Sequence, residues 1–368
     1  MSDIEDRTDT SEAAIVPAPK EHADGIYFGL DKDEYHRDPA LGSTDIKMLL
    51  KHPGDYWWQS WRNPSYEPKA TNFLDWGNAF HSLILEGEED FKDRYYRGPA
   101  KRDFPGLMVT MEDLRKFLRG VGKATTGTKE VLVQRVLDHE PAAPVWDKIV
   151  KDSVVLAEGR YILDHVDYDT VVLSSKMITK NPECSKAFVN GYPEVSIFWE
   201  QAGVRCKARI DYLRLKANID LKSIRNWKSK SFRDACIDEI FASGYDIQAA
   251  HYLNARSQIP ALIKAGRVFG DVSRAWLDRL ADETAKASVL KHSWIFYQAE
   301  GAPIAIREDW GSHMRHFVDC QNAIVDALRI YTRHVEVFGD DIWVDVSPRQ
   351  ELTDGEVPAW WGLRTYRN

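Results

Sequence analysis

Cysteine is scarce in this sequence, and the four cysteines are scattered. They are Cys184, Cys206, Cys236 and Cys320, and no two of them form a C-x-x-C pair. Because zinc ribbons and cysteine-ligated iron–sulfur clusters need such pairs, neither is expected here. Isolated thiols are typical of reduced cysteines, which predicts a cytoplasmic protein.

Long apolar runs are also missing. No stretch of about 18 apolar residues occurs, so no membrane span is expected. The first residues lack the basic start and apolar stretch of a secretory signal, so none is expected either. Apolar residues still make up 43% of the chain, with 13 Trp, 15 Tyr and 14 Phe. That composition predicts a sizeable folded core.

The chain also lacks the positive net charge typical of nucleic-acid-binding proteins, because its formal net charge is −8. Residues 1–24 carry seven acids and two bases, so the rest of the chain is only weakly acidic. These first residues show no periodicity and are predicted to be a disordered acidic tail. The remainder can still bind nucleic acid if its bases line one groove and its acids hold metal.

Hydrophobic periodicity predicts an α/β fold, a central mixed sheet flanked by helices. Alternating apolar residues predict strands at 194–199, 204–215 and 217–221, with a hairpin turn at Gly203. Apolar stripes at helical spacing predict helices at 71–89, 157–178, 244–258 and 310–338. We expect one domain over residues 25–338, followed by an ordered extension over residues 339–368.

The sharpest chemical signal is Asp211, followed nine residues later by Asp220 and then by Lys222. Asp220 and Lys222 are two apart on a strand, so they project from one face, and Asp211 on the preceding strand could meet both. Two carboxylates suit a hard divalent cation, and a lysine beside them can act on a water or on a developing phosphorane. The alternative is a solvated strand face, because D-x-K tripeptides are common. The apolar residues around the trio favour the functional interpretation, since buried charge is costly.

The order of motifs resembles the RecB-like branch of the PD-(D/E)XK nuclease superfamily. It is most similar to the C-terminal nuclease domain of RecE-type exonucleases (exonuclease VIII). The motifs that carry the resemblance are a G-x-x-x-H helix from Gly77 to His81, the strand Pro193–Trp199, Arg209–Asp211, Ile219–Ser223, and a Q-x-x-x-Y helix from Gln248 to Tyr252. The resemblance implies a restriction-endonuclease-like core.

The resemblance also implies a role for each residue. His81, Asp211, Asp220 and the Leu221 carbonyl would bind Mg²⁺, with Mn²⁺ as an alternative. Lys222 would act on the attacking water, and Glu194 would be a further acidic member of the site. Gln248 and Tyr252 would position the DNA backbone or their own helix. His81 could instead be a core histidine and Glu194 a surface strand residue. Gln248 and Tyr252 could be an ordinary amphipathic pair.

Residues 105–140 are interpreted as an inserted module of two short helices joined by a Gly- and Thr-rich loop. The module resembles a SAP-like motif, which implies DNA binding. One acid, Glu130, lies among its six bases, which are Arg115, Lys116, Arg119, Lys123, Lys129 and Arg135. We hypothesise that these bases contact phosphates and add nonspecific affinity for duplex DNA. The alternative is a two-helix prop with a solvated basic face.

The function expected from this resemblance is exonucleolytic digestion of linear double-stranded DNA, from 5′ ends, in bacterial or phage recombination. A single-strand annealing recombinase and a homo-oligomeric ring are the partners that the family implies. Three alternatives stay open. They are a structure-selective or nicking endonuclease, a CRISPR-associated nuclease with an iron–sulfur cluster, and a DNA-binding protein with a degenerate site. The scattered cysteines argue against the second, and the intact Asp211, Asp220 and Lys222 argue against the third.

Overall fold

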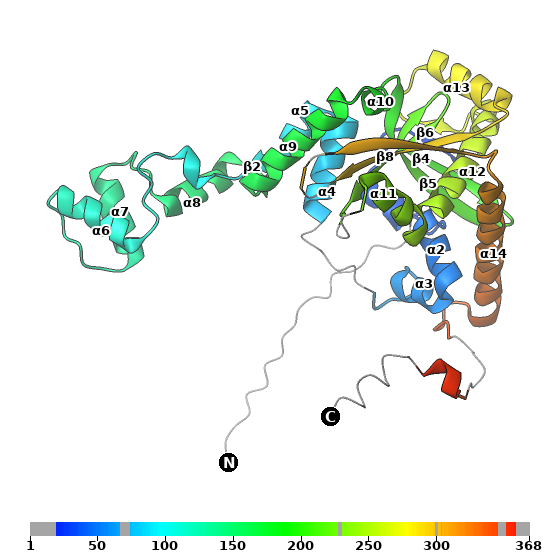
Figure 1. Ribbon diagram of the computed structural model, residues 1–368, viewed down its shortest axis with the longest axis horizontal. Helices are drawn as coiled ribbons and strands as arrows, with labels where there is room; N and C mark the ends of the chain where they lie inside the picture. Colours follow the sequence, from blue (N-terminus) through cyan, green and yellow to red (C-terminus); the bar gives the residue numbers. More distant parts are fainter. Residues whose placement is uncertain are drawn as a thin grey trace.

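The computed structural model describes residues 20–66, 74–226, 230–298, 301–302, 304–344 and 351–357. Its centre is a mixed sheet with the strand order β7-β1-β4-β5-β6-β8-β9 (Figure 1). The strands are β1 (Gly25–Tyr27), β4 (Gly191–Gln201), β5 (Val204–Arg214), β6 (Asn218–Ile224), β7 (Val268–Phe269), β8 (Lys291–Gln298) and β9 (Ala305–Gly311). Two short parallel strands, β2 (Tyr95–Arg97) and β3 (Tyr161–Leu163), form a second sheet.

Helices cover both faces of the central sheet, which confirms the predicted α/β class (Figure 1). The helices are α1 (Lys32–Arg37), α2 (Ser43–Lys51), α3 (Pro53–Gln59), α4 (Leu74–His81), α5 (Glu88–Arg94), α6 (Met111–Gly120), α7 (Lys129–His139), α8 (Trp146–Leu156), α9 (His165–Lys180), α10 (Pro182–Ser185), α11 (Phe232–Ala242), α12 (Tyr245–Lys264), α13 (Arg274–Lys286) and α14 (Arg315–Phe338). Three short elements complete the set: the π-helical turn η1 (Ser82–Glu86) and the 3₁₀ turns η2 (Lys101–Asp103) and η3 (Asp354–Glu356).

The two faces have separate hydrophobic cores. Helices α2, α3 and α11–α14 pack against one face, with Ile210 and Ile224 among the sheet residues of that core. Helices α4, α9 and α10 pack against the other face, where Ile219 and Leu221 are buried. Alternate residues of β6 therefore face opposite sides, as the two-residue period of a strand requires.

The predicted hairpin between β4 and β5 is confirmed. Gln201 pairs with Val204, so the turn consists of Ala202 and Gly203. Both have positive φ, 52° and 76°. Two positive φ values in a two-residue turn match the right-handed twist of the paired strands, and glycine accepts that conformation without steric cost.

Two helix predictions are corrected by the structure. The predicted helix 71–89 is interrupted, because a π-helical turn follows His81 and Gly87 then leaves the helix with φ 107°. The predicted helix 157–178 begins only at residue 165, after β3. Positive φ at Glu158 and Gly159 ends the preceding helix, and the Asp164 side chain caps the next one.

The helix predicted at 244–258 is longer than expected, since α12 continues past Pro260 to Lys264. A proline inside a helix removes one hydrogen bond and costs about 3 kcal/mol. Ile259, Leu262 and Ile263 lie in the core beside it. Burying three such side chains contributes more than that cost.

The inserted module has a core of its own, formed by residues of α6, α7 and the segments that flank them. It lies at the far end of an arm that contains α5, α8 and α9, away from the central sheet (Figure 1). Its ends are held together, because the Met108 N–H donates to the Pro144 carbonyl and the Trp146 N–H to the Met108 carbonyl. Ala143 and Val145 belong to its core. The predicted module bounds, residues 105 and 140, stay a prediction.

The predicted acidic tail is too long at its C-terminal end. His22 is buried, and its backbone N–H donates to Asp38 Oδ2 at 2.6 Å. Arg205 donates to the His22 carbonyl and so fixes this segment to β5. The rest of the predicted tail, residues 1–19, lies outside the described residues. In the predicted C-terminal extension, Trp343 is buried against Tyr56, whereas residues 345–350 and 358–368 lie outside the described residues.

None of the described helices combines the length and the apolar character needed to cross a bilayer.

Candidate active site

The site lies where β5 and β6 separate. The two strands pair only at Tyr212 with Ile219 and at Leu213 with Asn218. Beyond that point the Asp211 side chain replaces the missing backbone partner, and its Oδ2 accepts the Leu221 N–H at 2.7 Å. The predicted meeting of Asp211 with β6 is therefore present, and a backbone amide holds its carboxylate in place.

Asp220 and Lys222 project from one side of β6, as their spacing predicts. Asp220 is fully buried, and its Oδ2 lies 2.6 Å from the Lys222 ammonium nitrogen. That nitrogen also lies 5.0 Å from the centre of the Tyr245 ring. A buried ion pair is retained only when its geometry repays desolvation, and a cation over an aromatic face gains further attraction. The structure thus holds the lysine head group in one place.

His81 is the last residue of α4, directly before the π-helical turn. Such turns are rare and occur often at functional sites. Burial, together with the nearby Lys222 charge, lowers the pKa of His81 to about 4. The imidazole is therefore neutral at physiological pH and offers a lone pair, which a metal ligand requires.

Glu194 adopts a conformation that is unusual for a strand residue, with φ 51°. Non-glycine residues in this region are strained and concentrate at functional sites. The Glu194 carboxylate accepts a hydrogen bond of 2.5 Å from Arg209 Nε. Arg209 in turn donates to the Leu30 carbonyl and to Ser196 Oγ. Sequence reasoning did not assign Arg209 a role, although its position two residues before Asp211 places it on the same strand face.

His81, Glu194 and Asp211 form a cluster suited to a metal ion. One nitrogen or oxygen atom from each lies within 4.8 Å of the other two. Two carboxylates and an imidazole match Mg²⁺ and Mn²⁺ chemistry, with the nitrogen donor better suited to Mn²⁺. Asp220 is not a member of this cluster and faces Lys222 instead. The donor set of His81, Glu194 and Asp211 therefore fits a divalent cation, and Asp220, which the resemblance implied as a ligand, lies outside this set.

The protonation of Asp211 also favours a cation at this site. Burial and the neighbouring Asp220 raise the pKa of Asp211 well above its ordinary value. Without a cation, two ionised carboxylates at this depth repel one another. A divalent ion bound at Asp211 would offset that repulsion.

Helix α12 packs on the sheet face opposite to α4 and contributes further residues to the site. Gln248 Nε2 donates to the Tyr252 hydroxyl at 3.0 Å, so the predicted pair share one helix face. One turn further along, Arg256 is buried, has no carboxylate partner among the described residues, and donates to the carbonyls of Arg214 and Leu215. Burial lowers the pKa of Arg256 to about 10. This arginine fixes the connection between β5 and β6, a positioning role that the sequence did not reveal.

A groove of about 1520 Å³ opens over these residues. Its lining includes His81, Glu194, Asp211, Gln248 and Tyr252. Five of the predicted site residues therefore face one shared space. Asp220, Leu221 and Lys222 are not among the lining residues, and 16% of the Lys222 side chain is exposed.

The six basic residues of the module fall into two groups. Arg119 pairs with Glu112, Lys129 pairs with Asp147, and Arg135 donates to two carbonyls of the loop between α6 and α7. Within the described part of the chain, Arg115, Lys116 and Lys123 form no such ion pair or hydrogen bond. Lys116 and Lys123 are also exposed. These two lysines are therefore the module's most available cations.

Two family models match this chain. Residues 148–269 match a PDDEXK-like domain of unknown function (DUF3799), and residues 109–141 match the SAP domain. The first match covers roughly a third of the chain and includes Glu194, Asp211, Asp220 and Lys222 but not His81. Residues 148–269 are thus similar to a PDDEXK-like domain and residues 109–141 to a SAP domain, in agreement with the resemblance.

Two further comparisons are weaker. No curated protein matches the chain. Among solved structures, it is similar to a crystal structure from Eubacterium rectale described as a "putative exonuclease", at 14% sequence identity and a TM-score of 0.32. The match covers 73% of this chain and 88% of that one. A likeness this low does not establish a common fold.

Proposed function

We propose that this protein is a metal-dependent deoxyribonuclease that digests linear double-stranded DNA from an end. The observation that carries the proposal is the convergence of His81, Glu194 and Asp211 at one point beside the Asp220–Lys222 pair. A groove of about 1520 Å³ opens above them. The PDDEXK-like match over β4 to α12 supports the same chemistry.

Each residue has a role that follows from its position. His81, Glu194 and Asp211 would hold Mg²⁺ or Mn²⁺, and the family resemblance adds Asp220 and the Leu221 carbonyl. When bound, the ion polarises the scissile phosphate and lowers the pKa of a water. The Lys222 ammonium, held 2.6 Å from Asp220, would orient the attacking water and offset the charge that develops on phosphorus. Gln248 and Tyr252 line the groove and would position the DNA backbone.

Substrate form tests this proposal most directly. We expect linear duplexes labelled at the 5′ or 3′ end to be degraded from an end in Mg²⁺ or Mn²⁺, while closed circular DNA of the same sequence stays intact. An exonuclease of RecE type removes the 5′ label first. Nicking or cutting of the closed circle would instead establish the endonuclease alternative. Absence of any cleavage in both metals would overturn the assignment of a nuclease.

The SAP domain gives a separate prediction about DNA affinity. Replacing both Lys116 and Lys123 by alanine removes its two most available cations. Each phosphate contact contributes about 0.9 to the slope of log affinity against log salt concentration, so we expect the slope to fall by about 2. The measurement is fluorescence anisotropy with labelled duplex DNA at several salt concentrations, in the presence of a chelator to prevent cleavage.

The matched control replaces Lys92 and Lys148 by alanine. These lysines lie on the arm, each in an i,i+4 pair with an acid, and their loss changes the net charge by the same amount. The control should leave the slope unchanged. An equal change in both double variants would mean that net charge alone sets affinity and that the module does not contact DNA.

The RecE resemblance also implies a ring-shaped homo-oligomer, a single-strand annealing recombinase as partner and a role in phage or bacterial recombination. These stay predictions, and sedimentation analysis of the purified protein tests the first of them.

A further inference from the structure

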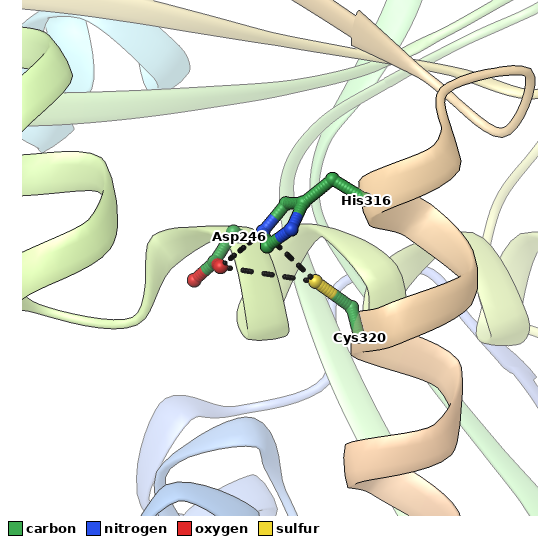
Figure 2. Close-up of side chains that lie close together, drawn as sticks. All are labelled: Asp246, His316 and Cys320. Carbon is green, nitrogen blue, oxygen red and sulfur yellow. Dashed lines mark hydrogen bonds and ion pairs between the residues drawn. The ribbon is translucent and has the colours of Figure 1, made fainter.

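A second group of metal-binding side chain types lies outside the active site, where α12 begins and α14 passes beside it. The group consists of Asp246, His316 and Cys320 (Figure 2). His316 Nε2 lies 2.7 Å from Asp246 Oδ2, and Cys320 Sγ lies 3.7 Å from the same oxygen. The sulfur and the His316 nitrogen are 3.5 Å apart. The three ligand atoms therefore converge on one point, as Figure 2 shows.

The sequence places these groups on rigid elements. His316 and Cys320 are four residues apart on α14, so they lie on one helix face. Asp246 is the second residue of α12. Cys320 and Asp246 are buried, whereas 40% of the His316 side chain is exposed. A site with two fixed, buried ligands and one ligand at the surface has an entry path for an ion.

The separations can be compared with those of a tetrahedral zinc site. Typical bond lengths to sulfur, imidazole nitrogen and carboxylate oxygen place the ligand atoms of such a site about 3.4–3.6 Å apart. Both distances from Cys320 Sγ, 3.5 and 3.7 Å, agree with that value. The distance between His316 and Asp246, 2.7 Å, is that of a hydrogen bond and would open by about 0.7 Å as an ion replaces the shared proton.

We propose that Asp246, His316 and Cys320 form a zinc site, with a water as the fourth ligand. Thiolate and imidazole donors select Zn²⁺ over Mg²⁺, so this site differs in chemistry from the oxygen-rich cluster at His81, Glu194 and Asp211. Burial and Asp246 raise the pKa of the Cys320 thiol, so it keeps its proton without an ion. A coordinated zinc displaces that proton.

The position of the site indicates what the ion would do. Asp246 follows Tyr245, whose ring lies against the Lys222 ammonium, and precedes Gln248 in the groove lining. A zinc ion would tie the start of α12 to α14 and so fix both residues relative to the active site. Its role would be structural, because none of its ligands lines the groove.

Cobalt binding tests the proposal without relying on activity. Co²⁺ gives a strong ultraviolet charge-transfer band only when a thiolate is bound, so the His81, Glu194 and Asp211 cluster is silent in this measurement. We expect the metal-free protein to develop the band on addition of one equivalent of Co²⁺, and Zn²⁺ to bleach it. The band should be absent in Cys320→Ser and retained in the matched control Cys236→Ser, a buried cysteine on the neighbouring α11.

A second variant guards against misfolding. His316→Gln changes a partly exposed side chain, and its Co²⁺ affinity should fall by more than about 100-fold, because even residues behind a metal ligand typically contribute 10–100-fold. Zinc should also raise the melting temperature of the wild type by more than that of either site variant. If no band forms in the wild type, or if His316→Gln binds Co²⁺ as tightly, the three residues are only a hydrogen-bonded link between α12 and α14.

Discussion

Replacing Lys222 by alanine should lower the single-turnover rate of DNA cleavage by about 10²–10⁴-fold. That range is typical of the loss of a positioned proton donor or of a charge that stabilises a transition state. The ammonium is held between Asp220 and the Tyr245 ring, and no other described lysine lies within ion-pair distance of Asp220. Single-turnover conditions with excess enzyme separate this chemical step from product release.

The control for this variant is Lys216→Ala. Lys216 lies in the connection between β5 and β6, is 73% exposed and pairs with Glu283 at the surface. The substitution removes the same charge a few residues away. It should leave the single-turnover rate within about a factor of two of the wild-type rate, since exposed pairs contribute little. Equal rates for Lys222→Ala and wild type would remove Lys222 from the mechanism.

Lys222→Ala has a second expected effect, on stability. The change leaves the buried Asp220 without its cation, and an uncompensated buried charge is strongly destabilising. We expect a lower melting temperature in chelator and partial recovery in Mg²⁺. The cleavage comparison is therefore made well below the melting temperature of the variant, with circular dichroism as the check on folding.

Much of this arrangement could be predicted from local sequence signals. The alternation of apolar residues predicts β4, β5 and β6, and the spacing of Asp220 and Lys222 places them on one face. The hairpin at Gly203 follows from turn chemistry. These features depend on residues close together in the chain, which is why periodicity finds them.

The features that were missed depend on contacts between distant segments. The φ of 51° at Glu194 arises in a strand that periodicity describes as regular. Arg256 acts on carbonyls about 40 residues away, and nothing in its own helix marks it. His316 and Cys320 show ligand spacing in the sequence, but their third partner lies 70 residues earlier. No pattern read along the chain brings such groups together.

The second large effect concerns Asp211→Asn, which should abolish cleavage while stabilising the metal-free protein. Asparagine keeps the acceptor for the Leu221 N–H but lacks the negative charge that a divalent ion requires. We expect a rate at least about 10³-fold lower, comparable to the loss of a central catalytic group. Wild type should gain thermal stability as Mg²⁺ is added, by about 2.7 kcal/mol at a hundred times the dissociation constant, and the variant should gain none.

The stability gain without metal follows from the sign of the pKa shift. Burial and Asp220 raise the pKa of Asp211, so the folded state prefers the neutral carboxyl. The favourable contribution of that neutral group is complete below the ordinary pKa of aspartate and is lost as pH rises through the raised value. Asparagine is neutral at every pH. In chelator, its advantage over wild type should therefore be absent in acid and grow towards neutral pH.

Urea denaturation across this pH range in chelator measures the difference, with Asp278→Asn as the control. Asp278 is 57% exposed and pairs with Arg274 on α13, so its change should leave stability nearly constant with pH. A variant less stable than wild type at neutral pH would show that the Asp211 carboxylate contributes more through its bond to Leu221 than it costs beside Asp220. The charge at this position would then serve the fold, and the case for a cation between these strands would be lost.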